Sequence, residues 1–300
     1  MKKILVIGSA NVDFVTYIDK MPKKGETKLG NAFLMNVGGK GANQAVACAK
    51  AGANVTFLAK IGQDENGKLI ESVLRESKVK SKLLVDSDSH TGIATIIVEN
   101  KTADNRIVVV KGANDKLTKN DIDNNIDLIK QCDILMVQLE IPLSVVKYVI
   151  TLGHIMHKKI ILNPAPAQKI DHKVLEYVTY LTPNKTELET LTKMSIADED
   201  DLKIALDKIS GFGVKNIIVT LGDKGSVLYK NKKLEYIPSY KVAATDTTGA
   251  GDCFNGVFAA CLSKGYKAID AIKYATKAAS ICITRNGAIK AMPNKKEIFE

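Results

Sequence analysis

The stretch Asp246–Asn255 reads D-T-T-G-A-G-D-C-F-N, and the rest of the chain can be interpreted outward from it. Gly249, Ala250 and Gly251 form a small-residue turn, after which apolar residues recur at helical spacing. Such a turn presents free backbone N–H groups and the positive end of a helix dipole, so it predicts an anion site, most simply for phosphate. Asp252 would repel that anion. It is therefore either a base that accepts a hydroxyl proton during phosphoryl transfer or an ordinary acidic residue of a helix first turn.

The composition indicates an ordinary globular protein. The chain has 300 residues, of which 45% are hydrophobic and 25% charged, enough for one large core or two small ones. The net charge of +10 comes from lysines that stand singly or in pairs, which favours a solvated surface over a nucleic-acid site. The absence of Trp also leaves few stacking platforms for single-stranded nucleic acid.

Cysteine spacing and hydropathy argue against four further features. The five cysteines contain no C-x-x-C pair, so neither a disulfide framework nor a zinc site is predicted. The apolar run Ile4–Ile7 is too short for a signal peptide, and no stretch approaches the ~20 apolar residues of a membrane span. We therefore expect a cytoplasmic protein with no membrane partner and no nucleic-acid partner.

Alternating strand and helix patterns predict the fold. Buried strands are expected at residues 4–7, 55–61, 134–139, 159–162, 178–181 and 217–220, and helices at 45–51, 68–76, 254–262 and 267–284. Hairpins are expected at residues 91–112, with a polar turn at 100–105, and at residues 227–236. This alternation predicts one three-layer α/β/α domain over residues 1–300, with a mostly parallel central sheet.

Polar residues follow the first predicted strand. Asn11 and Asp13 are two residues apart on an extended segment, so they point the same way, beyond the carboxyl end where α/β sheets bind ligands. They could hold adjacent hydroxyls of a polyol, or form a simple Asx turn. The run G-G-K-G-A-N-Q-A at 38–45 contains glycines that let backbone approach a ligand closely.

Two further acidic positions allow two interpretations each. Glu140 follows another predicted strand and is either a ligand contact or the acid of a helix first turn. Asn184 and Glu187 are three residues apart and share a face of a helical first turn. They form either a capping box or a pair of oxygen ligands suited to hydrated Mg²⁺.

These motifs together resemble those of the PfkB, or ribokinase-like, carbohydrate kinases. D-T-T-G-A-G-D at 246–252 resembles the family's second signature, and G-G-K-G-A-N-Q-A, about 200 residues upstream, resembles the first. Four shorter elements are similar in kind and in order: N-x-D at 11–13, P-N-x-x-E at 183–187, T-L-G-x-K-G at 220–225 and R-x-G-A at 285–288. The resemblance spans residues 4–293.

The resemblance implies roles for individual residues. The backbone of Gly249, Ala250 and Gly251 would form the anion hole, with Asp252 as the catalytic base. The implied sugar contacts are Asn11, Asp13, Gly39, Lys40, Asn43, Glu140 and Asp252. The implied ATP contacts are Asn184, Thr220, Gly222, Lys224, Gly225, Gly251 and Thr276, and Thr276 stands where the family usually carries Asn or His.

The resemblance also implies two cations. Mg²⁺ would be organised by Asn184 and Glu187, partly through water. A monovalent cation, usually K⁺, would be held by a set that comprises Asp246, Thr248, Cys282, Arg285, Gly287 and Ala291. Ala291 stands where the family usually has Ser, a change that a backbone carbonyl ligand survives.

The implied activity is ATP-dependent phosphorylation of D-ribose at O5. A lid formed by residues of about 12–35 and 91–112 would cover the sugar, with short strands in Pro22–Phe33, and its exposed edge would pair two copies into a homodimer. The alternatives are a kinase of the same family for deoxyribose, another sugar or a nucleoside, and a catalytically silent sugar or nucleotide sensor. A nucleic-acid-binding protein is suggested only by the charge.

Overall fold

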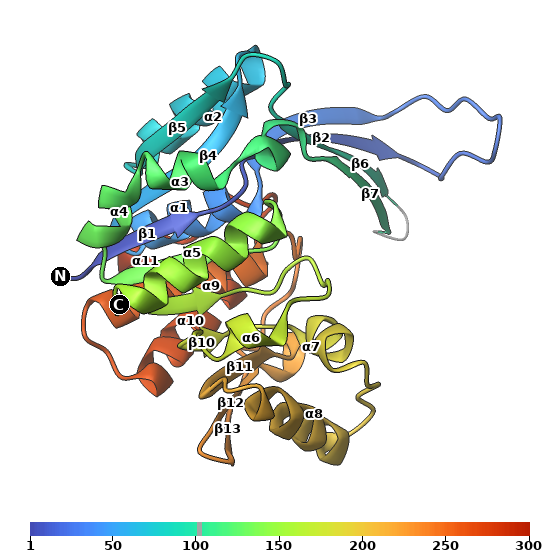
Figure 1. The fold of residues 1–300 in the computed structure, drawn as a ribbon. Helices are drawn as coiled ribbons and strands as arrows, with labels where there is room; N and C mark the ends of the chain where they lie inside the picture. Colours follow the sequence, from blue (N-terminus) through green and yellow to red (C-terminus); the bar gives the residue numbers. More distant parts are fainter. Residues whose placement is uncertain (101–103) are drawn as a thin grey trace.

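Apolar runs of the sequence form the strands of a large sheet (Figure 1). The structure is a computed structural model and describes residues 1–100 and 104–300. Within these residues the sheet has nine strands, in the spatial order β13-β12-β11-β10-β9-β8-β1-β4-β5. Their bounds are β1 (Lys3–Ile7), β4 (Asn54–Gly62), β5 (Lys80–Asp86), β8 (Ile134–Val137), β9 (Lys159–Leu162), β10 (Tyr180–Leu181), β11 (Asn216–Thr220), β12 (Ser226–Lys230) and β13 (Lys233–Ile237). Among the described strands of this sheet, β12 pairs antiparallel with β11 and β13 and all other pairs are parallel, so the predicted mostly parallel sheet and the 227–236 hairpin are confirmed.

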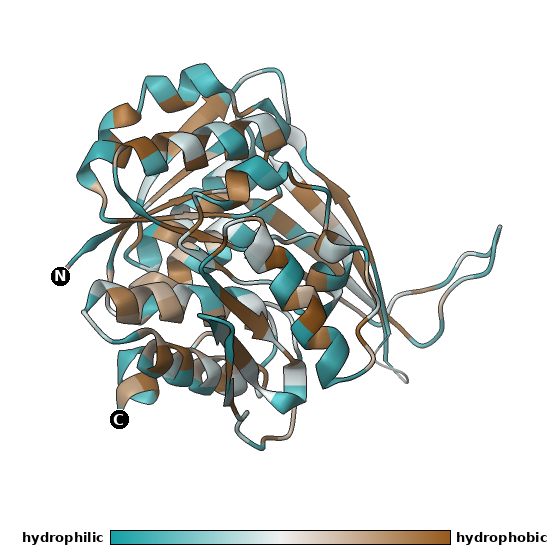
Figure 2. Ribbon diagram, turned by 60° about the horizontal axis from the view of Figure 1, so that its bottom comes forward, coloured by the Kyte–Doolittle hydropathy of each residue, from teal (hydrophilic) through white to brown (hydrophobic). Residues whose placement is uncertain are grey.

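Helices cover both faces of this sheet, because strand side chains alternate between the two faces. Ile4 and Val6 of β1 pack into one core, and Leu5 and Ile7 into the other. The first core is closed by α1 (Lys40–Lys50), α2 (Glu65–Glu76), α9 (Ala250–Ser263), α10 (Ala268–Cys282) and α11 (Lys295–Phe299). The second is closed by α3 (Lys119–Asp123), α4 (Ile126–Gln131), α5 (Leu143–Ile155), α6 (His172–Leu175), α7 (Lys185–Thr192) and α8 (Glu199–Gly211). Figure 2 shows apolar strands between helices whose outer faces are hydrophilic.

A second, smaller sheet projects from the large one (Figure 1). Within the described residues it has four strands, β3 (Ala32–Gly38), β2 (Asn11–Ile18), β6 (Gly92–Glu99) and β7 (Asn105–Val110), in that spatial order. β2 pairs antiparallel with β3 and parallel with β6, and β6 pairs antiparallel with β7. The hairpin predicted at 91–112 is therefore confirmed, although part of its predicted turn lies outside the described residues.

Several predicted boundaries were wrong by two to five residues, at α1, α2, α10, β8 and β10. Most of Pro22–Phe33, expected to be short strands, has no strand structure, and β3 begins only at Ala32. This segment contains Pro22, Gly25 and Gly30, which favour turns over strand pairing. The helix expected at 68–76 begins earlier, at Glu65, because the side chain of Asp64 accepts a hydrogen bond from the Gly67 N–H (2.8 Å) and caps it.

The strand order places the carboxyl end of β1 beside that of β8. From β1 the chain continues to β4 and β5 on one side of the sheet, and later to β8, β9, β10 and β11 on the other. The small sheet leaves the large one after β1 and again after β5. The carboxyl ends of β1 and β8 are thus the topological switch point, where open α/β sheets bind ligands. Two short 3₁₀ turns, η1 (Gly112–Lys116) and η2 (Gly222–Lys224), also follow strands. In the described part of the chain no helix is long and apolar enough to cross a membrane.

Candidate active site

A seam of small residues brings α1 and α9 into close contact. A Cβ atom on Gly256 would lie 2.4 Å from Cβ of Ala47 and 2.6 Å from the carbonyl oxygen of Gln44, so only glycine fits there. Because the two backbones approach so closely, short side chains at the start of α1 reach the first turn of α9. The two signature motifs, about 200 residues apart in the sequence, therefore meet at this seam.

The carboxylate of Asp252 lies at the junction of these helices and is only 6% exposed. Asn43 donates from Nδ2 to Oδ2 of Asp252 (2.9 Å), and Gln44 donates from Nε2 to Oδ1 (3.0 Å). Each carboxylate oxygen thus has one amide donor and keeps a lone pair. This arrangement holds Asp252 in one orientation with capacity to accept a proton.

The turn before Asp252 opens α9 without a side-chain cap. Gly249 is the N-cap, in the left-handed region with φ +76°, and a Cβ there would lie 2.8 Å from Cβ of Ala288. Gly251 is exposed, and a Cβ on it would have no atom within 4 Å. The Ala250 N–H donates to the Thr247 carbonyl over 3.3 Å, whereas no backbone hydrogen bond in the described residues uses the Gly251 N–H, which leaves it available to an anion.

Asn11 and Asp13 begin β2 beside the glycine-rich turn. The Nδ2 atom of Asn114 donates to Oδ1 of Asn11 (2.7 Å) and fixes the orientation of that buried amide. A Cβ on Gly38 would lie 2.1 Å from Oδ2 of Asp13, and a Cβ on Gly39 would lie 2.8 Å from the Asn11 nitrogen. Both glycines are therefore needed for β2 and the turn to pass each other.

Carboxylates converge on Lys40. Burial, then the negative charges of Glu140 and Asp252, raise the pKa of Asp13 to about 7. Burial alone would lower the pKa of Lys40, but the carboxylates of Asp252, Glu140, Glu187 and Asp13 together hold it above its ordinary value. The predicted sugar contacts and the predicted base thus share one electrostatic environment.

Glu140 also holds the start of α1. Its Oε2 atom accepts hydrogen bonds from the Ser9 hydroxyl (2.6 Å) and the Lys40 backbone N–H (3.1 Å). Ser9 follows β1 and Glu140 follows β8, so these bonds join the two strand ends at the switch point.

Asn184 and Glu187 form a capping box at the start of α7. Asn184 Oδ1 accepts from the Glu187 N–H (2.7 Å), and Glu187 Oε2 accepts from the Asn184 N–H (2.8 Å). Burial raises the pKa of Glu187 above its ordinary value. No group of three or more His, Cys, Asp or Glu residues within the described ranges forms a metal cage. The pair therefore fits only an ion such as Mg²⁺ that keeps most of its ligands from water and substrate.

Asp246 ties the turn before α9 to the loop after α10. Its carboxylate accepts from the Thr248 N–H (2.9 Å) and the Gly287 N–H (2.8 Å). Burial would raise the pKa of Asp246, but these bonds outweigh it and hold the pKa below its ordinary value. The side chain of Arg285 pairs with Glu297, which leaves only its backbone for the site.

The carbonyls of the predicted cation residues are mostly unengaged. In residues 1–100 and 104–300, no backbone hydrogen bond uses the carbonyls of Asp246, Thr248, Arg285, Gly287 or Ala291. The carbonyl of Cys282, by contrast, accepts from the Arg285 N–H (3.1 Å), so it fits a cation site less well. Five free carbonyls and one carboxylate suit a weakly hydrated cation.

The predicted nucleotide residues are more dispersed. Thr220 ends β11, and its N–H donates to the Pro183 carbonyl (3.0 Å), which places it beside Asn184. Gly222 and Lys224 are exposed in η2, and a Cβ on Gly222 would meet no atom within 4 Å. A Cβ on Gly225 would lie 2.1 Å from the Ile237 carbonyl oxygen, so this glycine serves the turn.

Thr276 is the member of the predicted set least accessible to a nucleotide. It lies in α10 and is 5% exposed. Its hydroxyl is 3.4 Å from that of Ser226 on β12, so its polar atom already faces a protein partner.

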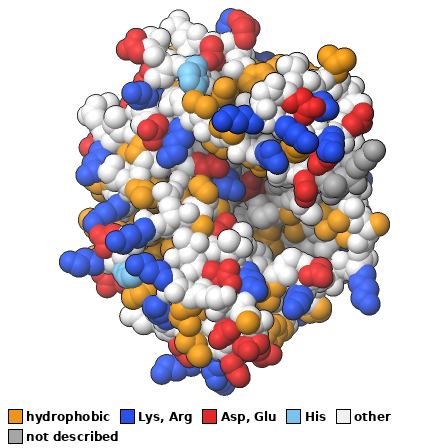
Figure 3. Space-filling model, turned by 90° about the vertical axis from the view of Figure 1, so that its right-hand side faces the viewer, with side chains coloured by type: hydrophobic (Ala, Val, Ile, Leu, Met, Phe, Trp, Pro, Cys, Tyr) orange, Lys and Arg blue, Asp and Glu red, His pale blue; other side chains and the backbone are white. Residues whose placement is uncertain are grey.

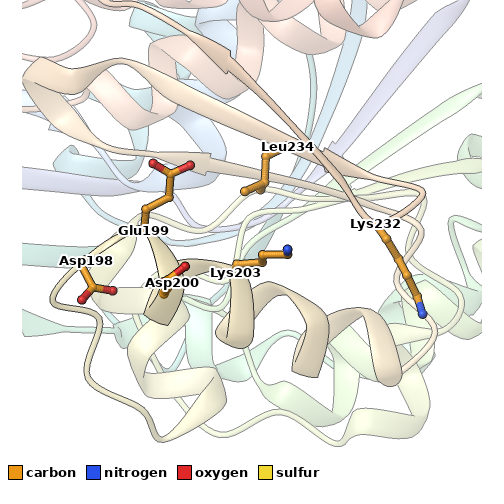
Figure 4. Close-up of a pocket in the computed structure, with 6 residues that line it drawn as sticks. All are labelled: Asp198, Glu199, Asp200, Lys203, Lys232 and Leu234. Atoms are coloured by element: carbon orange, nitrogen blue, oxygen red, sulfur yellow. The ribbon is translucent and has the colours of Figure 1, made fainter.

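The surface is hollowed on the side from which the small sheet projects, and acidic and basic side chains gather in that hollow (Figure 3). A separate surface pocket lies between α8 and the β12–β13 hairpin (Figure 4). Its lining residues are Asp198, Glu199, Asp200, Lys203, Lys232 and Leu234. None of these belongs to the predicted site, and Asp198 is the N-cap of α8, accepting from the Asp201 N–H (2.9 Å).

Five buried or partly buried polar residues around the site were assigned no role from the sequence. They are Ser9, Gln44, Asn114, Asn163 and Asn255. Gln44 stands inside the first signature, and its amide next to Asn43 was the only sequence signal available. The other four form hydrogen bonds with partners about 70 or more residues away in the sequence. Asn255 also donates to the carbonyl of Gly251, four residues before it in α9.

Comparison with known proteins agrees with this geometry. Residues 1–295 match the pfkB family carbohydrate kinases. The ribokinase of Haemophilus influenzae is 37% identical over 300 residues, which cover 100% of this chain and 98% of that protein. The deoxyribokinase of Salmonella typhi is 36% identical over 302 residues, which cover 99% of this chain and 97% of that protein. The solved structure of Arabidopsis thaliana ribokinase complexed with ribose and ATP has a TM-score of 0.90 at 32% identity, covering 99% of this chain and 97% of that one.

Both signature motifs, the mostly parallel sheet and full-length relatives lead to one assignment. The chain belongs to the pfkB family of carbohydrate kinases, and within that family it is an enzyme of the ribokinase type.

Proposed function

We propose that this enzyme transfers the γ-phosphoryl group of ATP to O5 of D-ribose, giving ADP and D-ribose 5-phosphate. The observation that carries the proposal is the carboxylate of Asp252, which two amides hold beside the open first turn of α9. A hydroxyl that donates to Asp252 would lie next to N–H groups that favour a phosphoryl group. The ribokinase relatives, one of them complexed with ribose and ATP, support this choice of substrates.

The polar cluster at the strand ends supports a polyhydroxylated substrate. Asn11 and Asp13 offer an amide and a carboxylate from β2, and Lys40 offers an ammonium from α1. The Oδ1 atom of Asn43 is buried without a hydrogen-bond partner in the described structure, which suits a sugar hydroxyl as its donor. Glu140 and the backbone of Gly39 complete the proposed sugar contacts. None of these residues is aromatic, so a nucleoside base would find no stacking surface among them.

In the proposed reaction, Asp252 takes the proton of the ribose O5 hydroxyl as O5 attacks the γ-phosphorus. The O5–P bond forms, the bond from phosphorus to the ADP oxygen breaks, and ADP leaves with that electron pair. The N–H groups from Gly249 through Ala250 to Gly251 stabilise the charge on the transferring phosphoryl oxygens. We assign ATP to the neighbouring surface formed by Asn184, Thr220, Gly222 and Lys224. Of the other predicted contacts, Gly225 serves the turn and Thr276 is buried.

Two cations are part of the proposal. Each carboxylate oxygen of Glu187 accepts one hydrogen bond within the capping box and keeps a lone pair for a water ligand of Mg²⁺. When bound with ATP, Mg²⁺ neutralises charge on the β- and γ-phosphate oxygens. Around Asp246, the free carbonyls of the predicted set would hold K⁺, and the loop that they form packs against Gly249 through Ala288.

The small sheet is proposed as a lid over the sugar and as a dimer interface. All residues of β7 are exposed, including Ile107 (54%), Val108 (64%) and Val109 (45%). An apolar edge strand that is open on both faces favours pairing with a second chain. We expect the mass of two chains in solution and the mass of one chain for Val108→Lys, measured by light scattering. A native protein with the mass of one chain would contradict the dimer.

The test of the activity is ADP release from Mg-ATP with D-ribose, 2-deoxyribose, fructose, adenosine and uridine, in K⁺ and in Na⁺. We expect ribose-dependent turnover that is faster in K⁺. Turnover with a nucleoside alone would retain the fold and reject the sugar. ATP binding without turnover on any substrate would favour a sensor.

A second substrate, 2-deoxyribose, is favoured by one specific observation. The deoxyribokinase of Salmonella typhi is nearly as similar to this chain as the ribokinase of Haemophilus influenzae, at 36% and 37% identity. The ratio of kcat/KM for the two sugars separates these functions, and we expect ribose to be preferred.

A further inference from the structure

A hydrogen-bonded network of buried polar side chains lies behind the carboxylate of Asp252, in an interior that is otherwise apolar. It crosses the carboxyl ends of three strands of the large sheet. Its members Gln44, Gln138, Asn163, Thr182 and Asn255 are all 6% exposed or less. Burying so many polar groups costs free energy unless each is bonded, so the pattern of their bonds is informative.

Gln44 is the central residue of this network. Its Nε2 atom donates to Oδ1 of Asp252 (3.0 Å) and to Oδ1 of Asn163 (3.0 Å). Its Oε1 atom accepts from Nε2 of Gln138 (2.7 Å). Both protons and the oxygen of the Gln44 amide are therefore used, and a flipped amide would place an oxygen against two acceptors. Gln44 can hold Asp252 in one way only.

The network continues to the proposed anion turn at Gly251. Asn163 donates from Nδ2 to the carbonyl of Thr182 (2.9 Å), and the Thr182 hydroxyl donates to Oδ1 of Asn255 (2.6 Å). Asn255 in turn donates from Nδ2 to the carbonyl of Gly251 (2.8 Å). One continuous set of bonds thus connects the carboxylate at position 252 with the backbone turn that precedes it.

We propose that Gln44 is a positioning residue for phosphoryl transfer, which orients the carboxylate of Asp252 toward the sugar hydroxyl and couples that orientation to the turn at Gly251 through Asn163, Thr182 and Asn255. The inference rests on the proposed role of Asp252 as the base. Asn43 also holds Asp252, but it is itself a proposed sugar contact and has an unpartnered oxygen in the described structure. Gln44 is fully bonded within the protein, so its amide serves orientation rather than substrate binding.

The test compares Gln44→Leu with Gln138→Leu. Both glutamines are 0% exposed, and both changes leave a buried amide partner unpaired, so both should lower Tm. Only Gln44→Leu removes a donor from Asp252. We expect Gln44→Leu to lower kcat by about 10- to 100-fold, because a small misplacement of a reacting group has effects of that size, with KM for ribose and ATP within about threefold. Gln138→Leu should keep a larger kcat than Gln44→Leu does.

Gln44→Glu is the near-isosteric second variant, in case Gln44→Leu does not fold. Its carboxylate would face Oδ1 of Asp252 across the 3.0 Å now spanned by a hydrogen bond, and two such carboxylates cannot both stay ionised. The acidic limb of kcat at saturating ribose should therefore move up by at least about one pH unit. The other titratable groups that act on Asp252 or respond to it are Asp13 on β2, Lys40 on α1, Glu187 on α7, Cys253 on α9 and Cys282 on α10, and none of them changes in this variant.

The outcomes separate the inference from the proposed function. Equal loss of kcat in Gln44→Leu and Gln138→Leu, with the acidic limb of Gln44→Glu unmoved, would reduce Gln44 to a core residue and overturn the inference while the function stands. Near-native turnover of Asp252→Asn, measured in parallel, would remove the base and the proposed function together.

Discussion

The two halves of the proposed site, one for the sugar and one for the nucleotide, are built differently. On the sugar side, Asn43 and Asp252 are buried and hydrogen-bonded to each other, and Gln44 behind them is bonded on every polar atom. On the nucleotide side, Gly222 and Lys224 lie exposed in a short turn that a single strand end positions. The proposed sugar half is therefore the preorganised one. A group that must meet one hydroxyl needs a fixed orientation, whereas a large nucleotide can be held by backbone and many weak contacts.

The largest expected effect is at the centre of the sugar side. Asp252→Asn removes the proposed proton acceptor, and kcat should fall by at least ~10²- to 10⁴-fold, the usual contribution of a positioned base. Steady-state ADP release measures this, with the circular dichroism spectrum and Tm as controls for folding. A variant that keeps native turnover would show that the buried carboxylate has only a structural role.

Gly249 and Gly251 of the proposed anion turn should respond to alanine in opposite ways. A methyl group on Gly251 meets no protein atom, and alanine favours a helix, so Tm should hold or rise. That methyl group would stand at the proposed position of the phosphoryl group, so kcat should fall at least ~10-fold. Gly249→Ala places a side chain at φ +76°, 2.8 Å from Cβ of Ala288, and should lower Tm instead. Unchanged kcat in Gly251→Ala would move the anion site elsewhere.

The pH dependence of stability should report the electrostatic cost of burying Asp13 near the carboxylates of Glu140 and Asp252. Its pKa rises from 3.8 to about 7 on folding, so between these values the folded protein binds a proton that the unfolded chain has released. Stability contributed by this group is therefore present at low pH and is lost as pH rises through about 7. Asp13→Asn should raise Tm relative to the native protein by about 2–5 °C at pH 8 and by much less at pH 5.

The matched control for Asp13→Asn is Asp19→Asn, since Asp19 is exposed in the loop that follows β2. Its Tm difference from the native protein should not vary over the same pH range. The idea fails if the two variants show the same pH dependence.

The smallest expected effect is on the nucleotide side. Lys224→Ala removes one exposed charge near the proposed phosphates and should raise KM for ATP by about two- to fivefold, with a smaller change in kcat. KM for ribose, measured in the same experiment, should not change. A loss of kcat as large as that of Asp252→Asn would mean that the exposed turn is as preorganised as the buried side. It would contradict the proposed difference between the two halves.

Much of the fold and of the candidate site could be predicted because the signals are local. The continuous apolar runs of β1 and β9 matched the predicted strands closely, since a strand buried on both faces must be apolar throughout. The glycine turn of Asp246–Asn255 and the 38–45 run were recognised from adjacent residues alone. Segments whose structure depends on distant partners were less predictable, as Pro22–Phe33 and the start of α2 illustrate.

The α/β alternation, the family motifs and the residue types available for phosphoryl transfer can all be read along the chain. Their contacts with one another depend on how the chain folds. The bond between Gln44 and Asp252 joins residues 208 positions apart, and it exists because Gly256 and Ala47 let two helices touch. Similarly, Asn184 and Glu187 satisfy a capping box, a role that their spacing alone could not separate from metal binding. Hydrophobic periodicity is written along the chain, but the orientation of a buried polar group depends on which distant partner can satisfy it.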